Sequence, residues 1–182
     1  MPSVLSKRLM TALLLACVMG YKTNKPGYAD AVEESTIKSV LTLNLARYSE
    51  WPASLFGSKQ ASINLCLLAD DTVQQAFALL DTKAIGNKTL SVHNINESKR
   101  LENCQILFAS EGSVNISQLN EQSYEQHILT IGESDDFLKK GGMVYMENSS
   151  GKINLHINLN ALEKAQIQIS SRVLKLATIY KP

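Results

Sequence analysis

The spacing of hydrophobic and polar positions along the chain predicts short strands and helices in alternation. Unbroken apolar runs such as "INLCLLA" and "CQILF" are typical of buried strands, whereas "KINLHINL" alternates strictly between apolar and polar residues. In that last run Ile153, Leu155, Ile157 and Leu159 share one face of the strand. The pattern predicts six strands, at residues 62–69, 88–95, 104–110, 127–133, 143–147 and 152–159.

Helical spacing connects most of these strands. The pattern predicts helices at residues 31–50, 70–80, 116–125, 158–166 and 169–180. In the first helix, apolar residues recur at helical spacing at Ile37, Val40, Leu41, Leu45 and Tyr48. Pro52 ends that helix, because a residue that precedes proline avoids helical backbone angles. We expect residues 135–142 to form a turn, since Gly141 and Gly142 tolerate positive φ.

Strands that alternate with helices favour an α/β fold. We expect a single three-layer domain, in which a mixed sheet of about six strands is flanked by helices. "ENSSG" is a turn signal between the last two strands, so residues 143–159 form a hairpin and the sheet cannot be purely parallel.

The first 29 residues have the pattern of a secretory signal peptide. Lys7 and Arg8 precede the apolar stretch Leu9–Gly20, which is too short to cross a membrane. We place cleavage after Ala29, so that residues 1–29 form the signal peptide and residues 30–182 form the domain. "LLAC", ending at Cys17, is an alternative lipoprotein cleavage box, which we rank below plain secretion.

The net charge of the mature chain limits the kinds of partner that it is expected to bind. The mature chain has 14 basic and 17 acidic side chains, a net charge of −3, and no run of like charge. This balance argues against nucleic acid as a partner and gives no support for electrostatic binding to a membrane.

Two cysteines, Cys66 and Cys104, remain after export. An even pair of cysteines in an oxidising compartment favours a structural disulfide. Two unpaired buried thiols and a redox-active pair are the alternatives, although no C-x-x-C spacing supports catalysis.

Candidate chemistry is sparse. Asp70 and Asp71 follow a strand and are better interpreted as helix caps than as metal ligands. We find no catalytic motif and predict no enzyme activity, no cofactor and no metal site. The candidate binding face is the polar side of residues 152–159, with Asn154, His156 and Asn158.

Four stretches of the chain resemble the YfiR-like family of bacterial periplasmic proteins. They are "LNLARYSEWP" at 43–52, "INLCLLAD" at 63–70, "LENCQILFAS" at 101–110 and the tail from "GGMVYMENSSG" to "VLKLA" at 141–177. The resemblance covers about residues 36–180. It also implies a disulfide between Cys66 and Cys104. A second cysteine pair known in the family is missing here, where Met143 and Met146 stand in that region.

The resemblance implies a regulatory function. It suggests a periplasmic protein that represses a membrane-anchored diguanylate cyclase through the periplasmic sensor domain of the cyclase, and so lowers cyclic-di-GMP and biofilm formation. It also implies an outer-membrane lipoprotein as a second partner, and a homodimer. The alternative is a small-molecule-sensing module that acts on another membrane sensor.

Overall fold

The computed structural model describes residues 27–57, 61–96, 101–110 and 116–181. The expected signal peptide falls almost entirely outside these ranges and stays a prediction. The helices are α2 (Tyr28–Arg47), a 3₁₀ turn (Ala53–Leu55), α3 (Asp71–Ala78), α4 (Ile116–Glu125), α5 (Asp135–Lys139), α6 (Leu159–Lys164) and α7 (Ser171–Leu174). The strands are β1 (Ser49–Glu50), β2 (Ser62–Leu68), β3 (Ala84–Ile85), β4 (Lys88–Asn94), β5 (Ile106–Ala109), β6 (Leu129–Gly132), β7 (Val144–Ser149), β8 (Lys152–Asn158), β9 (Gln168–Ile169) and β10 (Thr178–Tyr180).

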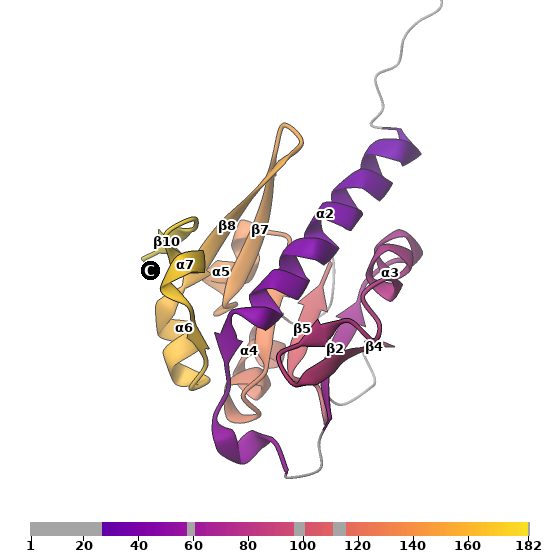
Figure 1. The fold of residues 1–182 in the computed structure, drawn as a ribbon. Helices are drawn as coiled ribbons and strands as arrows, with labels where there is room; N and C mark the ends of the chain where they lie inside the picture. The colour runs from indigo at the N-terminus through magenta and orange to yellow at the C-terminus, as the bar shows by residue number, and fades with distance from the viewer. Residues whose placement is uncertain (1–26, 58–60, 97–100, 111–115, 182) are drawn as a thin grey trace, which may run out of the picture.

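One eight-stranded mixed sheet organises the fold (Figure 1). Its strand order is β10-β8-β7-β6-β5-β2-β4-β3. The central strands β4, β2, β5, β6 and β7 are parallel, whereas β8 returns antiparallel beside β7 and β3 lies antiparallel to β4. A separate pair, β1 and β9, joins the exit of α2 to the C-terminal part of the chain.

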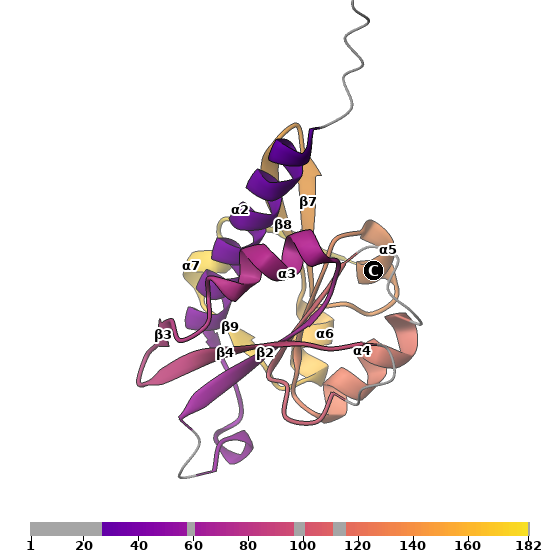
Figure 2. The same cartoon turned by 90° about the vertical axis from the view of Figure 1, so that its right-hand side faces the viewer.

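Helices cover both faces of this sheet, as the three-layer prediction required. Figure 2 shows α2 and α3 on one side of the sheet and α4 and α5 on the other. Alternate side chains of β2 face opposite sides of the sheet. Leu65 and Leu67 belong to the larger core under α2 and α3, and Cys66 belongs to a smaller cluster.

The disulfide predicted between Cys66 and Cys104 is present. It lies in the smaller cluster, where Leu107 and Ile128 pack against it and both cysteines are buried. The bond ties the middle of β2 to the segment that leads into β5, and so stabilises the pairing of these two central strands.

The strand count differs slightly from the expected one, and two expected helix boundaries are wrong. The sheet has eight strands rather than about six, because β3 and β10 add short edge strands. The first helix ends at Arg47 and not at residue 50, since Ser49 and Glu50 pair with β9. The helix expected over 169–180 is only α7, because residues 178–180 pair with β8 as an edge strand.

The expected turn at 135–142 contains the short helix α5. The Ser134 side chain caps it by accepting a hydrogen bond from Phe137 N at 3.2 Å. Phe137 is buried between Gly132 and Gly142, where an added Cβ would approach its ring to 2.3 Å and 2.1 Å respectively. Gly132 and Gly142 are therefore required for close packing. Of the two glycines for which the sequence suggested positive φ, Gly141 has it, with φ of 91°, whereas Gly142 does not.

Replacing both Cys66 and Cys104 with alanine should lower the free energy of unfolding by about 4 kcal/mol. That is the loop-closure entropy of a bridge with a separation of 38 residues. Urea unfolding of the oxidised wild-type protein and the double variant measures the difference. Reduced wild-type protein is the control for lost side-chain volume, and an unchanged midpoint after reduction would contradict the stabilising role of the bond.

Candidate binding site at the carboxyl end of the sheet

A crevice lies where the strand order reverses. After β2 the chain adds β4 on one side and then crosses over to add β5 on the other. In open α/β sheets, the carboxyl ends of strands at such a reversal are the usual place for ligands. A cavity of about 480 Å³ lies at this end, lined by Ala31, Glu34, Ser35, Lys38, Asp70, Val73, Glu133, Tyr145, Met146 and Asn148.

A buried lysine forms the polar centre of this cavity. The Lys38 side chain is 8% exposed and its Nζ lies 2.6 Å from Glu133 Oε1, just beyond β6. Nζ also forms an ion pair with Glu34, one helical turn earlier on α2. Burial lowers the pKa of Lys38, but the hydrogen bonds and charges of Glu133 and Glu34 outweigh it and raise that pKa above its usual value.

The face of α2 that carries Lys38 toward the sheet is polar. Ser35, Ser39 and Thr42 are buried beside it. The Thr42 hydroxyl donates to Lys38 O at 2.9 Å, and the Ser39 hydroxyl donates to Thr36 O at 2.8 Å. Both hydroxyl groups are satisfied within the helix, so the buried polar face does not require a ligand.

Asp70 lines the same cavity and caps α3, as the sequence predicted. Its Oδ1 accepts hydrogen bonds from Thr72 N at 2.8 Å and Val73 N at 3.1 Å. Within the described part of the chain, no group of three or more His, Cys, Asp or Glu residues is placed to hold a metal ion.

The three residues of the predicted polar face of β8 have different surroundings in the structure. Glu147 on β7 gathers two of its members: Glu147 Oε2 lies 3.1 Å from His156 Nε2 and accepts a hydrogen bond from Asn154 Nδ2 at 3.3 Å. The Tyr145 ring stacks on His156 with 5.2 Å between ring centroids. Hydrogen bonds from His156 and Asn154 lower the pKa of Glu147.

Asn158 does not join this cluster. It is buried, and its Oδ1 accepts a hydrogen bond from Ala161 N at 3.1 Å, which caps α6. Strand alternation correctly places Asn158 on the polar side, but the chain turns into a helix there and uses the amide locally. A binding role for the remaining face of Asn154 and His156 stays a prediction.

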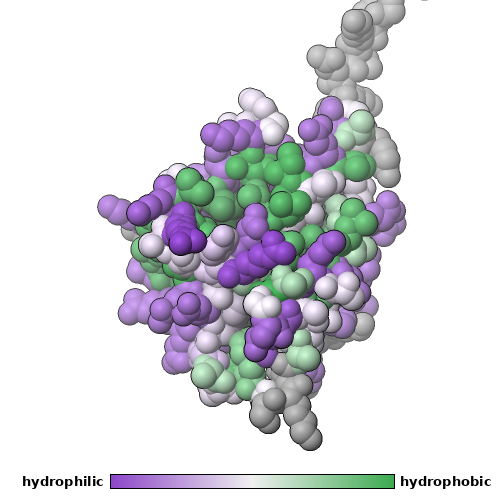
Figure 3. Space-filling view, viewed as in Figure 1, coloured by the Kyte–Doolittle hydropathy of each residue, from purple (hydrophilic) through white to green (hydrophobic). Residues whose placement is uncertain are grey.

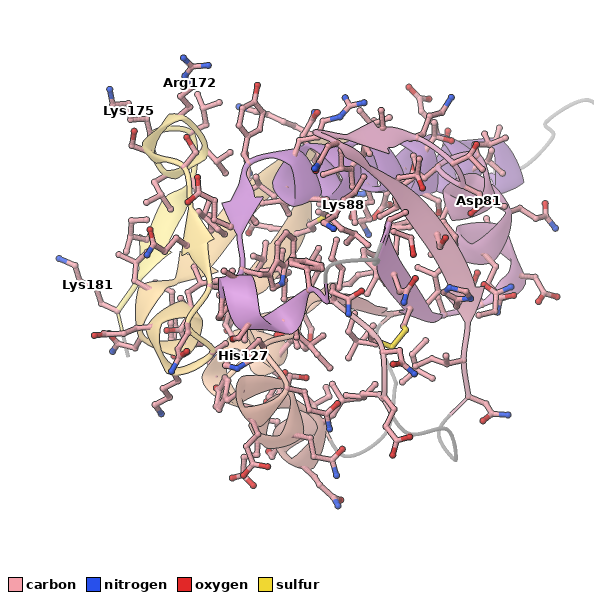
Figure 4. The ribbon with its side chains drawn as sticks, turned by 60° about the horizontal axis from the view of Figure 1, so that its bottom comes forward. Asp81, Lys88, His127, Arg172, Lys175 and Lys181 are labelled. Carbon is pink, nitrogen blue, oxygen red and sulfur yellow. A yellow bond between two sulfur atoms is a disulfide. The ribbon has the colours of Figure 1, made fainter. Side chains whose placement is uncertain are left out.

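The amino ends of the strands carry a second, polar hollow of about 660 Å³, part of which is formed by Asn64, Gln105 and His127. Figure 4 shows His127 at this end of the molecule, and its Nδ1 lies 2.9 Å from Ala165 O. Lys88 Nζ lies 4.6 Å from the ring centroid of Phe56. The rings of Phe56 and Trp51 form a T-shaped contact. Trp51 thus packs against the core, as predicted for the helix exit.

Local sequence patterns do not reveal the cluster of Lys38, Glu34 and Glu133. A Glu and a Lys four residues apart on a helix were a visible signal for the Glu34–Lys38 pair. Nothing in the sequence linked Lys38 to Glu133, which lies 95 residues away. Only the three-dimensional arrangement brings the three charges together.

The chain belongs to the YfiR/HmsC-like family, whose model matches residues 35–178. This result confirms the family resemblance and supports a regulatory role for the protein. No curated protein matches the chain. Among the described residues, none of the helices has the length and apolar character needed to cross a bilayer.

Two solved structures share the fold at low sequence identity. One is a conserved domain protein from Vibrio cholerae, with a TM-score of 0.53 and 13% identity over 80% of this chain. The other is an ABC domain in complex with L-Trp from Streptococcus pneumoniae, with a TM-score of 0.50 and 9% identity over 81% of this chain. Our chain spans 60% of the length of each, and the similarity concerns the fold alone.

The Lys38→Met variant should lose about 3 kcal/mol of folding free energy, because it leaves two carboxylates near the sheet without their cation. The pKa of Lys38 is raised in the folded state, so its contribution is complete below the unfolded value of 10.5 and disappears as the pH rises through the folded-state pKa. Urea unfolding from pH 7 to pH 11 measures this dependence.

Lys139→Met, which breaks an exposed pair with Asp135, is the matched control and should leave the midpoint unchanged. Equal effects of the two variants would contradict a special role for Lys38.

Proposed function

We propose that this protein is a periplasmic regulator that represses a membrane-anchored diguanylate cyclase by binding the cyclase's periplasmic sensor domain. The observation that carries the proposal is the family match over residues 35–178, which spans nearly the whole described domain. Repression would lower cyclic-di-GMP and with it biofilm formation. The protein acts by binding and not by catalysis.

Two features support the periplasm as the site of action. Residues 1–29 have the pattern of a secretory signal, and the buried Cys66–Cys104 disulfide fits an oxidising compartment. An outer-membrane lipoprotein that sequesters the regulator, and a homodimer, belong to the same proposal.

A second candidate function is a small-molecule-sensing module that acts on another membrane sensor. The cavity beside Lys38 favours it, because it lies at the carboxyl end of the parallel strands. One solved structure with this fold is an ABC domain in complex with L-Trp. Thermal-shift measurements on the mature protein against a panel of metabolites would test this candidate, and a panel without any stabilising compound would count against it.

Deleting the gene should raise cellular cyclic-di-GMP and increase biofilm, because the cyclase loses its repressor. Mass spectrometry of nucleotide extracts measures the change. Expression of the full chain should restore the low level, whereas a chain that lacks residues 1–29 should not, since it would stay in the cytoplasm. An unchanged cyclic-di-GMP level in a strain that carries a periplasmic-sensor cyclase would refute the proposal.

A further inference from the structure

The helix α2 lies on the sheet with an apolar stripe facing outward. Val40 is 49% exposed and Val32 is 37% exposed, and Ile37 is half-buried, whereas Leu41 packs against the core. The sequence pattern had placed Ile37, Val40 and Leu41 at helical spacing without deciding which of them face the core. Figure 3 shows apolar surface gathered between α2 and the β7–β8 hairpin. Contiguous apolar surface of this kind marks interaction sites on soluble proteins.

The outward position of this stripe follows from the charged cluster. Lys38 must face the sheet to reach Glu133, and Ser35, Ser39 and Thr42 are carried inward with it. Residues on the opposite side of the helix then face solvent because of the helical period. The exposure of Val40 therefore follows from the burial of Lys38 together with that of Leu45 and Ala46 on the other side of the helix.

A groove runs beside this stripe, between the first turns of α2 and the hairpin. Its volume is about 450 Å³, and it is lined by Asp30, Ala31, Glu33, Glu34, Ile37, Asn148, Gly151 and Ile153. Its apolar floor comes from Ala31, Ile37 and Ile153. Three of the lining residues are acidic and none is basic. We call these lining residues, together with Val40, the α2–hairpin groove.

We propose that the α2–hairpin groove binds a basic amphipathic helix of a partner protein. This inference rests on the proposed function, in that the partner is the membrane sensor that the protein regulates. The negative charge of the groove favours a positively charged partner, since Asp30 and Glu33 are exposed at its rim. Lys or Arg side chains of the partner would meet these carboxylates, while its apolar side chains would cover Ile37, Val40 and Ile153.

The dimensions of the groove suit a short helix. Its lining residues on α2 run from Asp30 to Ile37, which corresponds to about 11 Å or two helical turns, and Val40 lies one turn beyond Ile37. The other wall is the β7–β8 hairpin, with Asn148, Gly151 and Ile153. Apolar side chains one turn apart on a partner helix match the spacing of Ile37 and Val40.

The first test uses the periplasmic sensor domain of the candidate cyclase and the mature protein. The variant Glu33→Lys/Val40→Asp should weaken binding at least about tenfold, as expected when a buried contact and a favourable charge are lost together. The matched control is Glu121→Lys/Leu176→Asp, which changes an exposed acid on α4 and a leucine that is 85% exposed. It should bind within about twofold of wild type, and both variants should unfold at the wild-type urea midpoint.

The second test does not depend on the cyclase. A 14-residue helical peptide of Leu and Lys, and a twin with Glu in place of Lys, are titrated into the ¹⁵N-labelled mature protein. The Lys peptide should shift the amides of residues 31–41 and of Ile153, and the Glu peptide should not. Shifts elsewhere, or equal shifts from the two peptides, would overturn the proposal.

The outcomes separate the two proposals. A sensor domain that binds wild type and the groove variant equally leaves the proposed function standing and refutes the groove. If the sensor domain binds neither wild type nor the variant, the proposed function is refuted. The peptide titration then tests the groove independently of the cyclase. A dimer in analytical ultracentrifugation that the groove variant dissociates would show that a second copy of the chain occupies the groove, and would overturn the proposal.

Discussion

A lysine ammonium enclosed between two carboxylates determines how the first helix lies on the sheet. Lys38 is buried, so removing its partners would leave a costly unpaired charge in the domain. Its contact with Glu133 joins α2 to the carboxyl end of β6, across 95 residues of sequence. Together with the burial of Leu45 and Ala46 in the core, this contact orients α2 and leaves Val40 exposed on the opposite side of the helix.

The β7–β8 hairpin borders two surfaces of different character. On one side, Ile153 helps to form the groove beside α2. On the other, Glu147 holds Asn154 and His156 in a polar cluster under the Tyr145 ring. A regulator needs at least one surface for its target, and this family member places an apolar and a polar candidate on the two faces of one hairpin.

Local signals in the sequence predicted the central elements well. Asp70 was identified as a cap, and the alternation in residues 152–158 predicted β8 and its hairpin, because both depend on neighbouring residues only. The periodicity of apolar residues did not predict structure correctly where contacts between distant parts of the sequence determine it. The helical spacing of Val173, Leu174, Ala177 and Tyr180 suggested a helix to residue 180, but β8 offers residues 178–180 an edge to pair with. For Val40, the pattern identified a stripe but not whether the stripe faces the core, which Glu133 decides.

The pairing of β1 with β9 has a consequence for how the protein is made. Ser49 lies opposite Ile169, so this strand waits for a partner that is synthesised 120 residues later. Contacts this far apart in sequence carry an entropic cost of closure and slow folding. A nascent chain therefore cannot complete this domain in stages from the N-terminus, and the native form is reached only after β9 has been synthesised.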